Sequence, residues 1–222
     1  SYYDAYAGIV REYRLRYGPE RIQAIPSPAE ELDYLMGLCI IRLIDFDLDG
    51  TPELLLCWPE SEEAYHSYRY AIWTSTDGRT AEPVCENRVY DGAMSYLPHI
   101  NLVQRADGSY VGEELEAPEA DLARAYRKPG PGGLSDALTL CYTPPYGDEE
   151  RYLVNGESVS AQDYAQAEAN FLEGAQVEEI PFVFSGPQDA QAMARMFQAT
   201  YIALDQLGIQ SLEASTGSSA GL

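Results

Sequence analysis

The residues best suited to chemistry are four carboxylates close together in the chain, those of Asp45, Asp47, Asp49 and Glu53. The three aspartates alternate, and Gly50 follows them where a sharp turn needs a positive φ, which glycine adopts without strain. A chain that coils at this glycine turns all four side chains to one side. Carboxylates held a few ångströms apart repel one another unless a cation lies between them. The spacing therefore predicts a cation site.

Ca²⁺ is the cation that this loop fits best. It takes roughly six to eight oxygen ligands, and acidic side chains at loop positions 1, 3, 5 and 9 with a backbone carbonyl at position 7 supply such a shell. Position 12 is Leu56, which removes a bidentate carboxylate, so we expect a dissociation constant on the order of 10⁻⁴ M. The predicted metal ligands are the side chains of Asp45, Asp47, Asp49 and Glu53 and the carbonyl of Thr51.

The sequence of this stretch, IDFDLDGTPELLL, resembles the D-x-D-x-D-G-x-x-D/E-L calcium loops of FG-GAP and thrombospondin-type repeats, and more loosely the EF-hand. It departs from the EF-hand at position 12 and in its flanks. Residues 40–44 and 54–58 have the character of strands, so a helix–loop–helix is not expected. The resemblance implies a calcium loop between two strands.

A broader resemblance covers most of the chain. The chain resembles uncharacterised secreted or lipid-anchored proteins of Gram-positive gut bacteria. The resemblance lies in the same acidic stretch, in the helical patterns before it and in the later segment YLVNGESVSAQDY. That group has no settled activity. The resemblance implies an extracytoplasmic protein and leaves its ligand open.

Residues 46–51, FDLDGT, also resemble the first motif of haloacid dehalogenase-type phosphatases. That resemblance would make Asp47 the nucleophile, Asp49 the general acid and Mg²⁺ the cofactor. Against it, Pro52 stands where the family has Leu, and the only lysine, Lys128, lies in a Pro/Gly-rich segment. A phosphatase is therefore the alternative to the calcium interpretation. A third interpretation is an acidic turn between two core strands with no ion.

The composition of the chain excludes some classes of binding partner. The 222 residues carry 36 acidic and 14 basic side chains, a formal net charge of −22, and 45% of them are hydrophobic. Nucleic acid and anionic membranes need a basic footprint, so neither is expected as a partner. No apolar run reaches the roughly 18 residues of a membrane span. The first residue is Ser1, consistent with removal of a signal or lipid-anchor segment.

The four cysteines are widely spaced, which fits neither a zinc site nor a dense disulfide framework. We expect free buried thiols. Cys39 and Cys57 flank the acidic loop and would face each other if its strands pair, so a single disulfide there is left open.

Hydrophobic periodicity predicts helices towards both ends of the chain. Tyr2, Tyr6, Ile9, Val10, Tyr13 and Tyr17 recur at helical spacing, and Gly18 then ends the helix. Ser160 with Asp163 predicts a second helix start. Ser185-Gly186-Pro187-Gln188 would cap a third helix. Its predicted core face is Met193, Phe197, Tyr201, Leu204 and Leu207.

Between these helices the period changes to two, and Asp-Gly or Asn-Gly dipeptides predict hairpin turns. The predicted strands are residues 68–74, 81–90, 97–103, 110–115, 137–142, 151–154 and 180–184. The fold class is therefore α+β, an antiparallel β-sheet meander covered by N-terminal and C-terminal helices. We expect a single domain over residues 1–212 and a disordered tail at 213–222.

Three segments receive weaker predictions. Ser27-Pro28-Ala29-Glu30 has the form of a capping box and predicts a short helix carrying Leu32, Leu35 and Met36. Residues 118–127 are alanine-rich and predict another short helix. The Pro/Gly-rich residues 128–133 predict a mobile loop.

Other chemistry is sparse. Neither His66 nor His99 has metal or catalytic spacing, and no nucleophile elbow or nucleotide-binding loop is present in the sequence. The pair Glu113-Glu114 is interpreted as part of a solvated face. Trp73 is expected in the core, with an aromatic platform for a sugar or peptide as the alternative. These features together predict a monomeric, non-catalytic, extracytoplasmic domain that binds a carbohydrate or protein at the cell surface.

Overall fold

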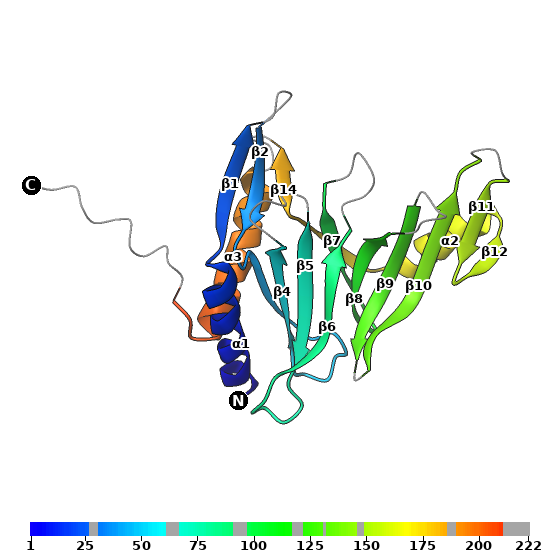
Figure 1. The fold of residues 1–222 in the computed structure, drawn as a ribbon. Coiled ribbons are helices and arrows are strands. Elements are labelled where there is room, and N and C mark those ends of the chain that lie inside the picture. The colour runs from blue at the N-terminus through cyan, green and yellow to red at the C-terminus, as the bar shows by residue number, and fades with distance from the viewer. Residues whose placement is uncertain are drawn as a thin grey trace, which may run out of the picture.

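The computed structural model describes residues 1–26, 31–60, 67–90, 97–116, 122–130, 132–145, 149–185 and 190–210. Within these ranges the chain forms three helices and fourteen strands (Figure 1). Every strand pairing recorded between them is antiparallel. None of the described helices is long and apolar enough to cross a membrane.

A four-stranded sheet lies at the centre of the molecule and carries the acidic loop. Its order follows the chain: β3 (Ile40–Ile44), β4 (Glu53–Pro59), β5 (Tyr68–Thr74) and β6 (Glu82–Val89). Strand β4 is buried along its whole length. Its successive side chains point to opposite faces, so Leu54 and Leu56 join one core while Leu55 and Cys57 join another.

Two helices cover one face of this sheet, α1 (Tyr2–Tyr17) and α3 (Ala190–Gln206). They lie together beside the sheet in Figure 1. Tyr6 and Val10 of α1 and Leu204 of α3 share a core with Leu54 and Trp58 of β4. The apolar stripe predicted for each helix is thus the side that packs, and Gly18 ends α1 as expected.

A seven-stranded sheet lies on the other side, in the order β12-β11-β10-β9-β8-β7-β13. Its strands are β7 (His99–Arg105), β8 (Gly108–Leu115), β9 (Leu122–Gly130), β10 (Gly133–Thr143), β11 (Arg151–Val154), β12 (Glu157–Val159) and β13 (Gln176–Pro181). Helix α2 (Ala161–Leu172) begins at the predicted cap, because Ser160 Oγ accepts the Asp163 N–H at 3.1 Å. Phe171 of α2 packs on Tyr110 and Tyr126 of this sheet.

A small third sheet has the order β1-β2-β14, formed by β1 (Arg21–Pro26), β2 (Glu31–Met36) and β14 (Val183–Ser185). The chain changes sheets at Phe182, between β13 and β14. The Phe182 carbonyl accepts the Leu35 N–H and the Tyr68 hydroxyl, and its ring stacks on Tyr68. One core therefore contains side chains from all three sheets.

The predicted fold class is confirmed: the described residues form antiparallel sheets with a helix at each end. Strands at residues 68–74 and 151–154 match the prediction to the residue, and the Asn155-Gly156 turn joins β11 to β12. The single-domain assignment stays a prediction. The tail at 213–222 lies outside the described residues.

The short helix predicted after Ser27 is wrong. Residues 32–36 belong to β2, which pairs with β1 on one side and β14 on the other. Serine and proline favour turns as well as helix starts, so the cap signal fits a hairpin equally well. The buried positions Leu35 and Met36 then pack as strand residues. The residues 27–30 themselves are not described.

The alanine-rich helix is wrong over residues 122–127, which belong to β9, while residues 118–121 lie outside the described residues. Residues 128–130 belong to β9 and Gly133 to β10 rather than to a loop, and the mobility expected there stays a prediction. Ala123 and Ala125 are buried, whereas Arg124 between them is half-buried, which is the alternation of a strand. Pairing with β8 and β10 outweighs the helical preference of alanine. Pro129 fits this strand because the pairing with β8 stops at Arg127, so no ladder bond is lost on that side.

All four cysteines are free. Cys57 pairs with Ile40 rather than with Cys39, which lies just before β3, and the Cys39 thiol donates to the Cys57 carbonyl oxygen at 3.3 Å. Burial raises the pKa of both thiols, which keeps them protonated.

Candidate metal site

The acidic loop joins two antiparallel strands, as its flanking residues predicted. Ile44 at the end of β3 pairs with Glu53 at the start of β4, so the eight residues between them form the loop. Gly50 has a φ of +89°, the conformation anticipated for it, and Leu48 also has a positive φ of +66°. The chain therefore coils tightly between the two strands.

Three of the predicted ligands come together. Asp45, Asp47 and Asp49 each offer a carboxylate oxygen, and these oxygens all lie within 4.8 Å of one another. Backbone donors hold all three side chains in place. The N–H groups of Asp49 and Gly50 donate to the two Asp45 oxygens at 3.1 and 2.9 Å, and the Asp49 N–H also reaches Asp47 Oδ1. The Thr51 N–H donates to Asp49 Oδ1. The loop backbone thus positions the carboxylates.

Glu53 is placed differently from the three aspartates. It is only 8% exposed, and its Oε2 accepts the Phe46 N–H at 2.9 Å. Burial, followed by the nearby charges of Asp47 and Asp49, raises the pKa of Glu53 to about 7. Its carboxylate is therefore close to the aspartates but lies outside their cluster. Thr51, whose carbonyl is the fifth predicted ligand, donates its N–H to Asp49 Oδ1 at 2.7 Å.

Neighbouring elements fix the loop against the body of the protein. The Phe46 ring is fully buried, and its carbonyl accepts the Ser109 N–H at 2.9 Å. Gly108 permits this approach, because a Cβ there would lie 2.5 Å from the Phe46 oxygen. On the other side the Tyr6 hydroxyl donates to the Pro52 carbonyl at 3.0 Å. Helix α1 and the β7–β8 turn therefore hold the loop from two directions.

The clustered aspartates have no basic partner among the described residues. Arg42, the basic residue nearest in sequence, instead forms an ion pair with Glu178 at 2.9 Å. Lys128 donates to the Asp107 carbonyl at 2.6 Å. No ion pair within the described part of the chain therefore compensates the cluster, which is the electrostatic setting of a cation site.

A hollow of about 590 Å³ opens beside the acidic loop; we call it the loop hollow. Asp47, Asp49, Thr51 and Glu53 line it on the loop side. The other walls come from the facing ends of β5 and β6 and from the tip of the β9–β10 hairpin. Residues distant in sequence thus enclose a space next to the predicted cation ligands.

The remaining candidates find other roles. His99 is half-buried, and its Nδ1 lies 3.1 Å from the Leu97 carbonyl oxygen, while His66 lies outside the described residues. Trp73 packs edge-on against Tyr13 of α1, so it belongs to the core as expected. The strand before the phosphatase-like motif, β3, pairs only in antiparallel fashion in the described part of the chain. The alternating strands and helices of a doubly wound phosphatase are not found there.

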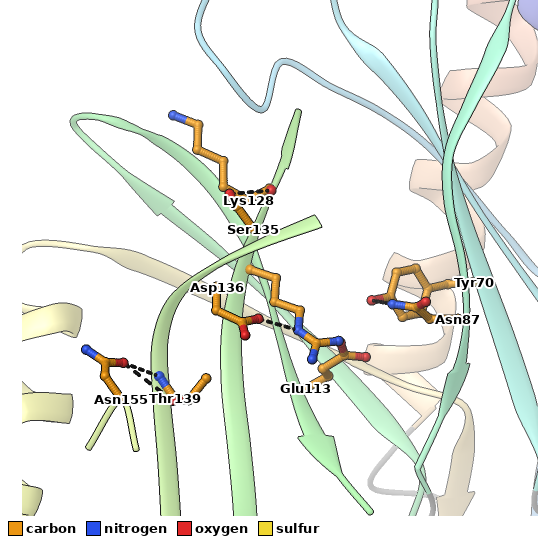
Figure 2. Close-up of polar contacts among 9 residues, drawn as sticks. Tyr70, Asn87, Glu113, Lys128, Ser135, Asp136, Thr139 and Asn155 are labelled. Carbon is orange, nitrogen blue, oxygen red and sulfur yellow. Dashed lines mark hydrogen bonds and ion pairs between the residues drawn. The ribbon is translucent and has the colours of Figure 1, made fainter. Parts of the chain in front are cut away.

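The interpretation of Glu113 as solvated is wrong. It is 3% exposed and forms an ion pair with Arg127 at 2.7 Å, and Arg127 also pairs with Asp136 at 2.8 Å (Figure 2). Tyr70 lies beside Glu113, and its hydroxyl accepts a hydrogen bond from Asn87 at 2.9 Å. A signal was available in the sequence, since Glu113 follows the buried Val111 by two positions on one strand. We use the name Glu113 network for Tyr70, Asn87, Glu113, Arg127 and Asp136.

Comparison with known proteins adds no assignment. No protein-family model, no curated protein and no solved structure matches this chain. What the protein does must therefore be inferred from the site itself.

Proposed function

We propose that the protein is a non-catalytic, extracytoplasmic domain in which the loop between β3 and β4 binds Ca²⁺. The observation that carries the proposal is the convergence of Asp45, Asp47 and Asp49 within 4.8 Å with no basic partner among the described residues. A divalent cation would remove the repulsion between these groups. Asp45, Asp47, Asp49, Glu53 and the Thr51 carbonyl are its proposed ligands.

The ligand set favours Ca²⁺ over Mg²⁺. Calcium accepts variable numbers of oxygens in flexible geometry, whereas magnesium demands a near-octahedral shell and gives up its waters reluctantly. A loop of carboxylates and one carbonyl, with no bidentate group at position 12, supplies an incomplete shell that calcium tolerates better. Glu53 joins that shell by turning from the Phe46 N–H towards the cluster or by using its second oxygen.

The proposed location follows from affinity. Extracellular calcium modules bind with dissociation constants of roughly 10⁻⁴ to 10⁻³ M, which matches the concentrations outside cells. A loop with this incomplete shell falls in that range. The formal net charge of −22 also fits a domain that does not bind nucleic acid or anionic membrane.

Thermal unfolding with calcium and with chelator tests the proposal. At about ten times the dissociation constant, bound calcium adds roughly 1.4 kcal/mol to the free energy of unfolding. For a domain of this size that raises the melting temperature by about 3–6 °C. Asp47→Asn should abolish the rise because it removes a ligand charge while keeping an acceptor for Asp49 N–H.

Asp205→Asn is the matched control, since Asp205 is exposed on α3 and removes the same charge elsewhere. It should leave the calcium response intact. Equal melting of the wild type in calcium and in chelator would refute the proposal. Mg²⁺-dependent hydrolysis of p-nitrophenyl phosphate that is lost in Asp47→Asn would replace it with the phosphatase alternative.

A further inference from the structure

Ser75, directly after β5, is the least explained polar residue of the loop hollow. It is 4% exposed, lines the hollow, and its hydroxyl has no hydrogen-bond partner among the described residues. Leu54 pairs with Trp73, so Glu53 and Ser75 lie at the same end of β4 and β5. A buried hydroxyl without a partner is unfavourable, and rotation of the Ser75 side chain towards the hollow would let a bound molecule supply the partner.

The calcium shell also has free positions on this side. Five loop ligands fall short of the roughly six to eight oxygens that Ca²⁺ takes, so about one to three positions remain for outside oxygens. Asp47, Asp49, Thr51 and Glu53 all line the loop hollow, whereas Asp45 lines a separate depression. We therefore expect the free positions to open into the hollow.

The charges of the walls select the chemistry of the ligand. In the described chain, every charged side chain that lines the hollow is acidic. Three of them belong to the acidic loop and the start of β4, and the fourth, Glu82, belongs to β6. An anionic ligand would be repelled by Glu82, and an ammonium group has no lone pair to offer the free calcium positions. A hydroxyl group suits both, because its oxygen coordinates Ca²⁺ while its hydrogen donates to a carboxylate.

We propose that the loop hollow binds a neutral carbohydrate through calcium, with two neighbouring sugar hydroxyls completing the Ca²⁺ shell and another bonding to Ser75. This inference rests on the proposed calcium function and adds a ligand class to it. The volume of about 590 Å³ lies in the usual range of small-molecule sites, roughly 300–1,000 Å³. A mono- or disaccharide therefore fits the space.

Two measurements on the full chain separate this inference from the calcium site. Calorimetric titration with CaCl₂ alone tests the proposed function, and a blank titration refutes both proposals. An array of immobilised neutral and acidic sugars is then probed with labelled protein, at about ten times the calcium dissociation constant and in chelator. Binding to neutral sugars that disappears in chelator supports the inference.

Ser75→Ala should weaken binding of the best neutral sugar about tenfold, the effect of losing one buried hydrogen bond, while leaving the calcium titration unchanged. Ser158→Ala, on the exposed edge strand β12, is its control and should change neither.

Glu82→Gln should weaken binding of the sugar about threefold, whereas Glu86→Gln on the same strand should leave it unchanged. If calcium binds but no neutral sugar does, if acidic sugars bind instead, or if Ser75→Ala binds as tightly as wild type, the inference is wrong.

Discussion

The acidic loop and the Glu113 network both gather carboxylates, and they differ in what neutralises them. In the network, Arg127 lies between Glu113 and Asp136 and forms an ion pair with each. In the loop, Asp45, Asp47 and Asp49 converge without any such partner in the described chain. One cluster has its counter-charge within the chain, and we propose that a cation supplies it for the other.

The two clusters also differ in position. The Glu113 network lies between the four-stranded and seven-stranded sheets, since Tyr70 belongs to β5 and Glu113 to β8. The loop is at the end of β3 and β4, with Asp47 and Asp49 exposed beside a hollow. An ionised carboxylate enclosed between sheets is unfavourable without an internal partner, because it has lost its water. A carboxylate at the end of a sheet stays hydrated and needs no internal partner. The comparison therefore contrasts a buried, paired cluster with an exposed cluster that has the setting of the proposed cation site.

The largest expected effect tests the structural side of this comparison. Arg127→Met removes the guanidinium that faces Glu113 and Asp136 and leaves Glu113 buried without its partner. Breaking a buried pair in this way costs about 3–5 kcal/mol. Because Glu113 can take up a proton in the variant, we expect a loss of about 3 kcal/mol in the free energy of unfolding, measured by urea denaturation near neutral pH.

Arg151→Met is the control for this change, since Arg151 is exposed on β11 and far from the Glu113 network. It should alter stability by less than about 0.5 kcal/mol. Adding Glu113→Gln to Arg127→Met should recover part of the loss by removing the unpaired charge. A loss below about 1 kcal/mol for Arg127→Met would mean that solvent, rather than Arg127, compensates Glu113.

A smaller effect tests the loop through pH. In the calcium-free protein the pKa of Glu53 is raised to about 7 by burial and by Asp47 and Asp49, so the folded state holds a proton that the unfolded state releases at lower pH. The folded state binds more protons in this window, so stability falls as pH rises from about 4.5 to 7 and is then level. With partial solvent access we expect about 1–2 kcal/mol.

Glu53→Gln should remove this decline, because the amide keeps an acceptor for the Phe46 N–H without titrating. Urea denaturation in chelator at about pH 5 and pH 7.5 measures it. Saturating calcium should suppress the decline in the wild type by neutralising the carboxylate. If the wild type and Glu53→Gln lose stability equally over this range, Glu53 is not the group responsible.

The convergence of the aspartates was predictable because the residues that produce it are local. Asp45 to Glu53 spans nine residues, and the alternation of aspartates with Gly50 at the turn encodes the convergence directly. The antiparallel α+β fold was predictable for a similar reason, since hairpins join neighbours in the chain. Period-two alternation also located β5 and β11 to the residue.

Features built from distant residues were not predictable. The loop hollow combines residues near 47, 75 and 130, and the Glu113 network combines residues 70, 87, 113, 127 and 136. The β9 segment failed for a related reason, because the local helical preference of alanine was outweighed by pairing with β8 and β10. Pairing partners of this kind emerge only when the sheet is assembled.

The smallest expected effect returns to Ser75 and sharpens the distinction between internal and external partners. If its hydroxyl is unsatisfied in the ligand-free protein, Ser75→Ala removes a buried polar group that had no partner, so stability should stay the same or rise by up to about 1 kcal/mol. If an internal group does satisfy it, the same change should cost about 1 kcal/mol. Thr200→Ala is the contrast, because the buried Thr200 hydroxyl accepts the Ile41 N–H at 3.2 Å and donates to the Cys39 carbonyl, so its loss should destabilise by about 1–3 kcal/mol. Urea denaturation of the two variants side by side, in chelator and without sugar, decides whether the hollow has a hydroxyl free for a ligand.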